Sequence, residues 1–166
     1  MTAAIDDWRQ KHSRISPPHV QRANTLRPVL FVRADRCHVD LQLVHVEGDF
    51  PDGLNRIEGV RALDPTATFY VFPNVARVCN ELGVTSHGLA LFMLQGADDD
   101  FGIACLGGEC FGQAGAGFLR FSCAEPNDRL QQALEFIPKA IARTDRLQAW
   151  LAKHPQYRLA KPYAIE

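Results

Sequence analysis

The final third of the chain carries hydrophobic residues at the spacing of one helical face. These residues are Leu130, Leu134, Ile137, Ile141, Leu147, Trp150 and Leu151. Steps of three and four positions place side chains on the same side of an α-helix. Pro126 suits the first turn of such a helix, whereas Pro138 predicts a kink within it. The pattern therefore predicts a long, kinked helix that ends at 154–155.

The middle of the chain contains short segments typical of strands. They are 60–63, 68–72, 103–106 and 118–123. Segments 68–72 and 118–123 are dominated by aromatic, β-branched and other apolar residues, which favour extended structure. Between the strand candidates, Ser86 is a suitable N-cap for a helix that carries the apolar residues of 89–94.

The first part of the chain is more polar and is interrupted by prolines. Residues from His19 to Val46 have a helical pattern that Pro28 should kink or split, and 47–53 is a turn-rich break. The predicted divisions are an extended lead-in over 1–15, a single domain over 16–152 and a tail over 153–166. Short strands mixed with helices predict an α+β two-layer sandwich. Its small, mainly antiparallel sheet should have helices on one side and a long C-terminal helix.

Composition narrows the class of protein. The chain has 166 residues, is 46% hydrophobic and 22% charged, and has a formal net charge of −1. Its basic residues are spread along the sequence, which argues against a nucleic-acid partner. No apolar run reaches the roughly 18 residues of a membrane span, and the acidic N-terminus does not resemble a signal peptide. We therefore expect a cytoplasmic protein without a membrane partner.

The five cysteines do not form a disulfide or zinc pattern. Their number is odd and no Cys-x-x-Cys pair occurs, so we expect reduced thiols, several of them buried, and no metal site built from Cys105, Cys110, Cys123 or a histidine. Asp98–Asp100 lacks the spacing of an EF-hand and is interpreted as a solvated loop. One alternative is a nucleophilic Cys110, beside Glu109 and with His87 as its base.

Arg120 is a charged residue in the middle of the apolar segment 118–123. Removing a guanidinium from water is costly unless an anion meets it. That anion is either a structural carboxylate, for instance Glu109 or Glu125, or a ligand. The residues alone favour the structural ion pair.

Several segments, taken in chain order, resemble consecutive motifs of one family. They are 17–23, 53–60, 65–75, 102–112 and 117–122. Leu-Asn-Arg-Ile-Glu-Gly-Val at 54–60 is similar to the motif Leu-Asn-x-Ile-x-Gly-Val, and Gly-Phe-Leu-Arg-Phe-Ser at 117–122 is similar to Gly-x-Leu-Arg-Leu-Ser. The order resembles the C-terminal small domain of class I/II aminotransferases, the aspartate-aminotransferase-like branch of fold type I pyridoxal-phosphate enzymes. The resemblance runs from about Ser16 to Ile141.

The chain departs from the family pattern at a few positions. Ala67 stands where the family usually has glycine, Gly107 stands where it usually has proline, and Pro28 falls within a helix that should be continuous. The stretch 44–52 is longer than in the family. These differences affect the expected bridging helix more than the expected sheet.

The resemblance implies that Arg120 binds the α-carboxylate of an amino acid or 2-oxo acid. A guanidinium suits this role because it is planar, always charged and able to form two parallel hydrogen bonds to a carboxylate. The family's cofactor is pyridoxal phosphate, held by a lysine in a Ser-x-x-Lys setting. The lysines of this chain, Lys11, Lys139, Lys153 and Lys161, do not have that setting. We expect no catalytic or cofactor-binding residue here and no binding of the cofactor by this chain alone.

The missing lysine leaves two interpretations open. The first is an aminotransferase small domain that is truncated or split from its large domain and does not transfer amino groups by itself. The second is a non-enzymatic module derived from that domain, which binds small carboxylates or takes part in assembly. Its partners would be an amino acid or 2-oxo acid, and either a separate large domain or a second copy of the chain, because an unpartnered small domain exposes an apolar face.

Overall fold

The structure is a computed structural model that describes residues 49–65 and 68–165. The predicted lead-in over 1–15 and the helical pattern of 19–46 lie outside these residues. The helices are α2 (Asp49–Asn55), α3 (Ala76–Leu82), α4 (Ser86–Gln95), α5 (Asn127–Ala142) and α6 (Thr144–Lys153). The strands are β1 (Tyr70–Val71), β2 (Leu106–Gly107) and β3 (Leu119–Ser122), and the short 3₁₀ turns are η1 (Gly108–Phe111), η2 (Gln113–Gly115) and η3 (Pro155–Tyr157). This arrangement confirms the predicted α+β class.

The strands form one small antiparallel sheet in the order β1–β3–β2. Tyr70 pairs with Ser122 and Val71 pairs with Phe121, while Leu106 pairs with Arg120. Backbone bonds on either side, from Cys123 N to Phe69 O (2.7 Å) and from Leu119 N to Pro73 O (3.0 Å), continue the β1–β3 pairing. The predicted strands at 68–72 and 118–123 are therefore confirmed, with shorter bounds. In contrast, only Leu106 of the strand predicted at 103–106 is in a strand, and β2 consists of Leu106 and Gly107.

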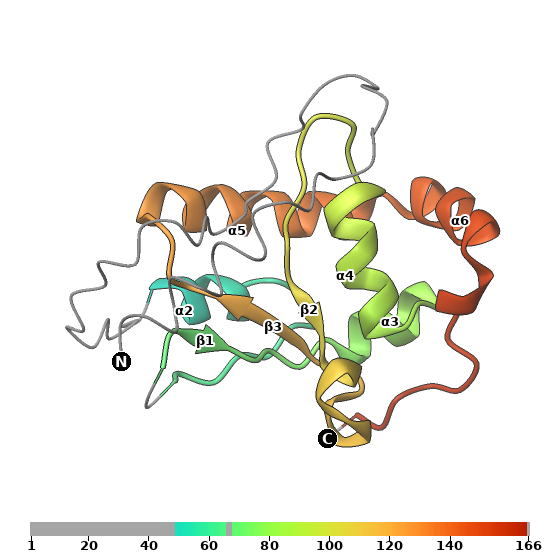
Figure 1. Ribbon diagram of the computed structural model, residues 1–166, viewed down its shortest axis with the longest axis horizontal. Coiled ribbons are helices and arrows are strands. Elements are labelled where there is room, and N and C mark those ends of the chain that lie inside the picture. Colours follow the sequence, from blue (N-terminus) through green and yellow to red (C-terminus); the bar gives the residue numbers. More distant parts are fainter. Residues whose placement is uncertain (1–48, 66–67, 166) are drawn as a thin grey trace, which may run out of the picture.

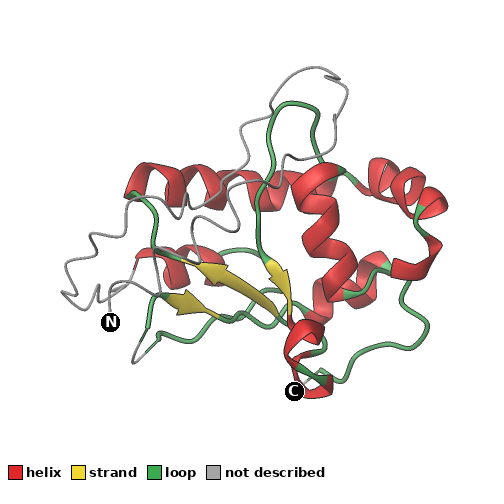
Figure 2. Cartoon of the chain, in the orientation of Figure 1, coloured by secondary structure: helices red, strands yellow, loops and turns green. Residues whose placement is uncertain are grey.

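Alternation along the strands gives the sheet two different faces. Val71, Leu119 and Phe121 are buried on the inner face. Tyr70, Leu106 and Arg120 lie on the opposite face, which we call the outer face. The helices pack on the inner side, with α5 along the sheet and α3, α4 and α6 gathered on the right of the view (Figure 1 and Figure 2).

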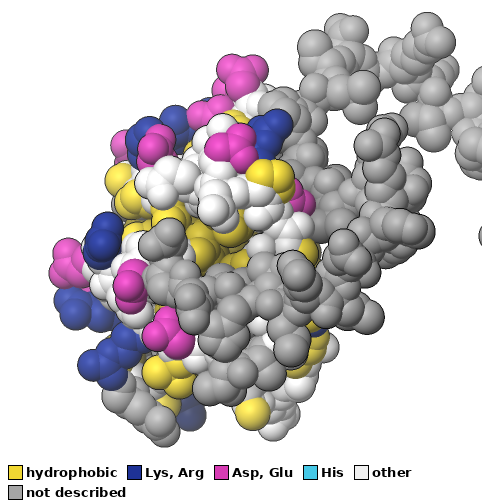
Figure 3. Space-filling model, turned by 90° about the vertical axis from the view of Figure 1, so that its left-hand side faces the viewer, with side chains coloured by type: hydrophobic (Ala, Val, Ile, Leu, Met, Phe, Trp, Pro, Cys, Tyr) yellow, Lys and Arg dark blue, Asp and Glu magenta, His cyan; other side chains and the backbone are white. Residues whose placement is uncertain are grey.

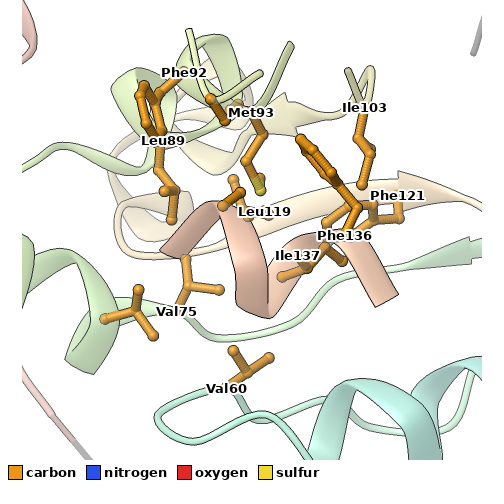
Figure 4. Packing of buried hydrophobic residues seen from close by; sticks show 14 of the residues in the cluster. Val60, Val75, Leu89, Phe92, Met93, Ile103, Leu119, Phe121, Phe136 and Ile137 are labelled. Atoms are coloured by element: carbon orange, nitrogen blue, oxygen red, sulfur yellow. The ribbon is translucent and has the colours of Figure 1, made fainter. Parts of the chain in front are cut away.

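The core lies between the inner face and the helices. Figure 4 shows Leu119 and Phe121 of β3 turned toward side chains of α4 and α5, among them Met93 and Ile137. Helix α2 adds Phe50, whose ring meets that of Phe121 edge to face at 5.8 Å between centroids. Each such side chain contributes roughly 1.5–3 kcal/mol when it is removed from water. This packing fixes the position of β3, and therefore of Arg120.

The turn-rich break predicted at 47–53 is wrong over 49–53, because Asp49–Asn55 forms helix α2; 47–48 lie outside the described residues. Phe50 and Leu54 are four positions apart and both are buried, so they give the segment an apolar helical face. Pro51 is compatible with the first turn of a helix. Gly53 allows close contact with α5, because a Cβ atom there would lie 2.3 Å from Leu134 Cδ1.

The edge strand predicted at 60–63 is also wrong. Its backbone pairing is limited to a bridge between Arg61 and Asn74. The side chain of Asn55 bonds to both backbone polar groups of Ala62, the residue after Arg61. Ala62 N donates to Asn55 Oδ1 (2.8 Å), and Asn55 Nδ2 donates to Ala62 O (3.0 Å). An amide side chain thus takes the place of a neighbouring strand.

Helix α3 was not predicted. Asn74 Oδ1 accepts a hydrogen bond from Ala76 N (2.9 Å) at its start, and Gly83 ends it in the left-handed conformation (φ 68°). An ion pair between Arg77 and Glu81, one turn apart, lies on its exposed side. Asparagine before the helix and glycine after it are the sequence signals that identify this element.

The C-terminal helix is interrupted beyond Pro138, the position of the predicted kink. Helix α5 continues through Pro138 to Ala142, and the interruption lies at Arg143 (φ −82°, ψ 56°), after which α6 begins. Arg143 Nη1 donates to Asp98 Oδ2 (2.5 Å) and to the Ala97 carbonyl. This arginine therefore ties the interruption to the loop that follows α4.

Candidate functional site

Arg120 lies on the outer face of the sheet between two aromatic rings. Its Cζ is 4.4 Å from the ring centroid of Tyr70 on β1 and 4.5 Å from that of Phe111 at the end of η1. The residue is half-buried. A guanidinium in such contact with aromatic faces gains roughly 0.5–2 kcal/mol. The guanidinium carbon thus lies over both rings, and the group keeps several N–H donors around its planar fork.

The structural carboxylate partner expected for Arg120 is not found in the part of the chain that the structure describes. Within residues 49–65 and 68–165, Arg120 forms no ion pair, and Glu109 is bonded to other groups. The residues alone favoured such an ion pair, for instance with Glu109 or Glu125, and neither of these carboxylates, both among the described residues, pairs with Arg120. Aromatic contacts, rather than a carboxylate, make the half-buried position tolerable. The role of Arg120 in binding a ligand stays a prediction.

Further aromatic side chains surround this pair of rings. Phe72 lies edge to face with Phe111 (5.8 Å between centroids) and stacks on Phe118 (5.4 Å). The exposed fraction is 36% for Tyr70, 39% for Phe72 and 49% for Phe111. The outer face is therefore an apolar surface with one cation in it. A small carboxylate with an apolar body complements such a surface.

Glu109 joins η1 to the beginning of α4. Ser86 Oγ donates to Glu109 Oε2 (2.6 Å) and Tyr163 Oη donates to Glu109 Oε1 (2.7 Å). Burial acts to raise the pKa of the carboxyl group, but these two hydrogen bonds, together with bonds from the backbone of Glu109 and His87, outweigh it and the pKa is lowered. Burial and the bond to Glu109 raise the pKa of Tyr163 to about 12. The network therefore consists of an ionised carboxylate and a neutral phenol at neutral pH.

Close backbone contacts hold the loop that carries Phe111. A Cβ atom on Gly107 would lie 2.4 Å from His87 Cα, and one on Gly108 would lie 1.9 Å from Gly115 O. Only glycine allows these approaches, because either clash involves backbone atoms that a side-chain rotation cannot move. The departure from the family's proline at Gly107 thus accompanies tight packing of β2 on α4.

Cys110 and His87 are neighbours, as the alternative with a nucleophilic cysteine requires. Cys110 Sγ is 3.7 Å from His87 Nδ1, and Cys110 is exposed. The sequence identifies a cysteine and a histidine as candidates, but the distance between Sγ and Nδ1 is known only from the structure. Cys79 and Cys123 are buried, and burial raises the pKa of both thiols, that of Cys123 to about 11.

The acidic run after α4 is bonded to arginines. Asp98 pairs with Arg143, and Asp99 pairs with Arg146 (2.6 Å). Within the described ranges, no group of three or more His, Cys, Asp or Glu side chains is arranged to hold a metal ion. No helix in the same ranges has the length and apolar character needed to cross a membrane.

A large hollow is separate from the outer face. It lies between α2 and α5, measures about 620 Å³, and is lined by residues that include Asp52, Arg56 and Glu135. Figure 3 shows the end of the molecule where α2, β1 and the start of α5 lie, with hydrophobic side chains near the centre and charged ones around them. Tyr70, Phe111 and Arg120 do not line this hollow, so it is distinct from the candidate site.

The described residues do not fit covalent binding of pyridoxal phosphate beside Arg120. Lys139 lies on α5 next to Phe101 and Phe136, Lys153 is the last residue of α6, and Lys161 belongs to the C-terminal segment. The side chains in contact with Arg120 are the two aromatic rings. A lysine for this cofactor would therefore have to come from outside the described residues.

Comparisons with known proteins give partial matches. No protein-family model matches the chain. The aspartate aminotransferase of Pyrococcus horikoshii is 30% identical over 88 residues, which cover 53% of this chain and 20% of that protein. The aromatic-amino-acid aminotransferase 2 of Thermococcus litoralis is 28% identical over 83 residues, or 50% of this chain and 19% of that protein.

A solved structure, the alanine aminotransferase from Pyrococcus furiosus, aligns with 55% of this chain and 22% of its own, at 26% identity and a TM-score of 0.47. The match thus spans about a fifth of the length of the curated relatives. About half of this chain is similar to aspartate and aromatic aminotransferases, which is consistent with an aminotransferase-like C-terminal domain.

Proposed function

We propose that this aminotransferase-like chain supplies the carboxylate-binding part of a site for an amino acid or 2-oxo acid, with Arg120 as the binding residue. The observation that supports this proposal is the position of Arg120 between Tyr70 and Phe111, at 4.4 and 4.5 Å from their ring centroids. The rings contact the guanidinium without using its N–H donors as an ion pair would, and a carboxylate can bond to that planar fork through two parallel hydrogen bonds.

The aromatic surface favours a ligand with an apolar part. Phe72 extends the surface from Phe111 toward Phe118. Its exposed rings would cover the carbon chain of an amino acid, while Arg120 would fix the orientation of its carboxylate. Orientation of this kind is the contribution that the domain makes to amino-group transfer in our proposal.

We propose further that amino-group transfer depends on a separate large domain that carries the cofactor lysine. Pyridoxal phosphate supplies the electron-accepting chemistry in enzymes that use it. In this chain, Lys139 and Lys153 lie on α5 and α6, and neither contacts Arg120. We expect the chain alone, mixed with pyridoxal phosphate, aspartate and 2-oxoglutarate, to show no turnover; steady turnover would overturn this part of the proposal.

Isothermal titration tests the carboxylate site directly. The full chain is titrated with aspartate and with 2-oxoglutarate, beside Arg120→Ala and the control Arg129→Ala, which removes an exposed arginine of α5. We expect Arg120→Ala to weaken binding by about 10- to 100-fold, since hydrogen bonds between charged groups contribute about 1.5–3 kcal/mol. Arg129→Ala should bind as the unaltered chain does. Equal affinities of the unaltered chain and Arg120→Ala would refute the role of Arg120.

A second candidate function is docking on another protein domain. The exposed outer-face residues Tyr70, Leu106 and Phe111 favour it, because apolar surface of this kind is typical of interfaces. In our proposal this candidate predicts self-association when no partner is present. Light scattering across a concentration series measures it; a monomer at all concentrations that also fails to bind a hydrophobic dye would contradict it.

A further inference from the structure

A site distinct from Arg120 lies at the beginning of α4, where Cys110 of η1 meets His87. The Sγ of Cys110 is 3.7 Å from Nδ1 of His87. Cys110 is exposed, and the two residues border a surface hollow of about 350 Å³. Thr85, Glu109, Gln156 and Tyr157 complete its lining. A nucleophile within reach of a base, at the edge of an open hollow, is the arrangement that activates a thiol.

The structure holds both side chains in place from several sides. The His87 ring lies edge to face with Tyr157 at 5.6 Å between centroids. Gly107 packs directly on the His87 backbone, and Glu109, next to Cys110, is bonded to Ser86. These contacts fix η1 against α4, so the short distance between sulfur and imidazole follows from the packing of the backbone.

The other described thiols have different surroundings. Cys79 and Cys123 are 0% and 3% exposed, so a reagent in solution cannot reach them without local unfolding. Cys105 is only partly exposed. Cys110 thus combines an exposed sulfur with a contact to a base, and reactive cysteines typically occur in such partly exposed environments.

We propose that Cys110 is a modification site for small disulfides, with His87 as the base that accepts the thiol proton. The proton moves from Sγ to Nδ1, in the tautomer that carries its hydrogen on Nε2. The thiolate attacks one sulfur of the disulfide, a new S–S bond to Cys110 forms, and the original S–S bond breaks. The departing thiolate takes the proton from His87 and leaves as a thiol. No further oxidant or reductant is needed.

Titratable groups around the pair affect the pH dependence of this reaction. Cys110 and Glu109 face His87 from η1, and Tyr157 faces it from η3. The Glu109 carboxylate opposes formation of a second negative charge nearby. Both of its oxygens accept hydrogen bonds, from Ser86 and from Tyr163, which reduces that opposition.

The test measures the rate at which Cys110 is modified. The full chain in a Cys37→Ser background is mixed with bis(2-hydroxyethyl) disulfide, and the adduct is located by peptide mass mapping. N-acetylcysteine in the same tube serves as a reference thiol. At pH 7 we expect Cys110 to react about tenfold faster than the reference, because an unassisted thiol is only a few per cent ionised there. The difference should shrink near pH 9.5, where the reference ionises by itself.

Two variants separate assistance by His87 from simple exposure. His87→Gln should lower the rate at Cys110 to about that of the reference, and Cys110→Ser should remove the adduct. Circular dichroism tests whether His87→Gln is folded. If this variant is unfolded, assistance by His87 is judged from the pH profile of the unaltered chain against that of the reference thiol. A rate at pH 7 equal to or below that of N-acetylcysteine, or modification of the other cysteines in preference to Cys110, would overturn the proposal.

Discussion

Arg120 and Arg143 are both only partly exposed, yet they are accommodated in different ways. Arg143 donates from Nη1 to the Asp98 carboxylate and to the Ala97 carbonyl, so its guanidinium is bonded within the fold. Arg120 is held by the faces of two aromatic rings and forms no ion pair with a carboxylate of 49–65 or 68–165. The comparison distinguishes an arginine that stabilises the fold from one whose donors remain suited to a ligand.

The loops beside the two arginines differ in a corresponding way. The loop after α4 presents Asp98 and Asp99 to arginines that follow α5 or lie on α6. The loop after β2 presents Phe111 to Arg120 and uses glycine contacts to do so. We infer that stability and ligand binding should respond differently to substitutions in the two places. The substitutions below test that difference.

Gly108→Ala should have the largest effect, because it disturbs the loop beside Arg120 without touching Arg143. The new Cβ would lie 1.9 Å from the Gly115 carbonyl oxygen, so backbone must move. We expect a loss of about 2–3 kcal/mol in the free energy of unfolding, as in other overpacked sites. Urea denaturation measures it.

Gly83→Ala is the control for Gly108→Ala. Gly83 has a positive φ (68°) and nothing within 4 Å of its would-be Cβ. It should cost only about 1–2 kcal/mol, the usual penalty for a left-handed residue with a side chain. A smaller loss at Gly108 than at Gly83 would show that the close contact with Gly115 does not position the loop.

Arg143→Ala should be the next most damaging substitution. It leaves the buried Ala97 carbonyl without its donor and removes the ion pair to Asp98. Because the arginine side chain is 39% exposed, we expect a modest loss of about 1–2 kcal/mol. Arg120→Ala should cost less than about 1 kcal/mol, the lower part of the range for cation–π contacts, because the Tyr70 and Phe111 rings that it contacts are themselves exposed. Equal losses in urea denaturation would remove the distinction between the two arginines.

Phe111→Ala should have a smaller effect on stability and a clear effect at the candidate site. Phe111 is 49% exposed but touches both Arg120 and Phe72. We expect about 0.5–1 kcal/mol of lost stability, and carboxylate binding weakened less than by Arg120→Ala. Calorimetry and urea denaturation on one sample measure both. Leu63→Ala, at an 87% exposed position, is the control that should change neither.

The sheet could be predicted from sequence because its signal is local. Aromatic and β-branched residues in 68–72 and the apolar run around Arg120 indicate strands without knowledge of their neighbours. Helix α2 was missed because Pro51 and Gly53 suggest a turn, and only packing against Leu134 of α5 shows why glycine is needed there. Tertiary contact, rather than local preference, decided that element.

The candidate site shows the same limit. Sequence identified Arg120 as a charge in need of a partner, but left that partner open between a ligand and a carboxylate such as Glu109 or Glu125. The structure bonds Glu109 to Ser86 and Tyr163 and places Phe111 over the guanidinium. Phe111 is only nine positions from Arg120, yet its contact depends on the turn through η1 and η2. No sequence pattern gives the direction of such a turn.

Acid pH should distinguish the contributions of the two arginines to the free energy of unfolding. This is the smallest effect that we expect. The backbone N–H of Asp100 and the Arg143 guanidinium lower the pKa of Asp98 to about 2, below the ordinary value of about 4. A carboxyl group whose pKa is lower in the folded state stabilises the fold fully at pH values above its pKa in the unfolded state. That contribution is lost as the pH falls toward the pKa of the folded state. The stability difference between the unaltered chain and Asp98→Asn should therefore shrink between about pH 4 and pH 2.

The same series run on Arg120→Ala provides the contrast. The contacts of Arg120 with Tyr70 and Phe111 involve no carboxyl group, so its contribution to the free energy of unfolding should stay constant from pH 5 to pH 2.5. Urea denaturation at several pH values in this range measures all three chains. A contribution of Arg120 that falls with pH as that of Asp98 does would mean that a carboxylate of this protein, rather than a ligand, is the partner of its guanidinium edge.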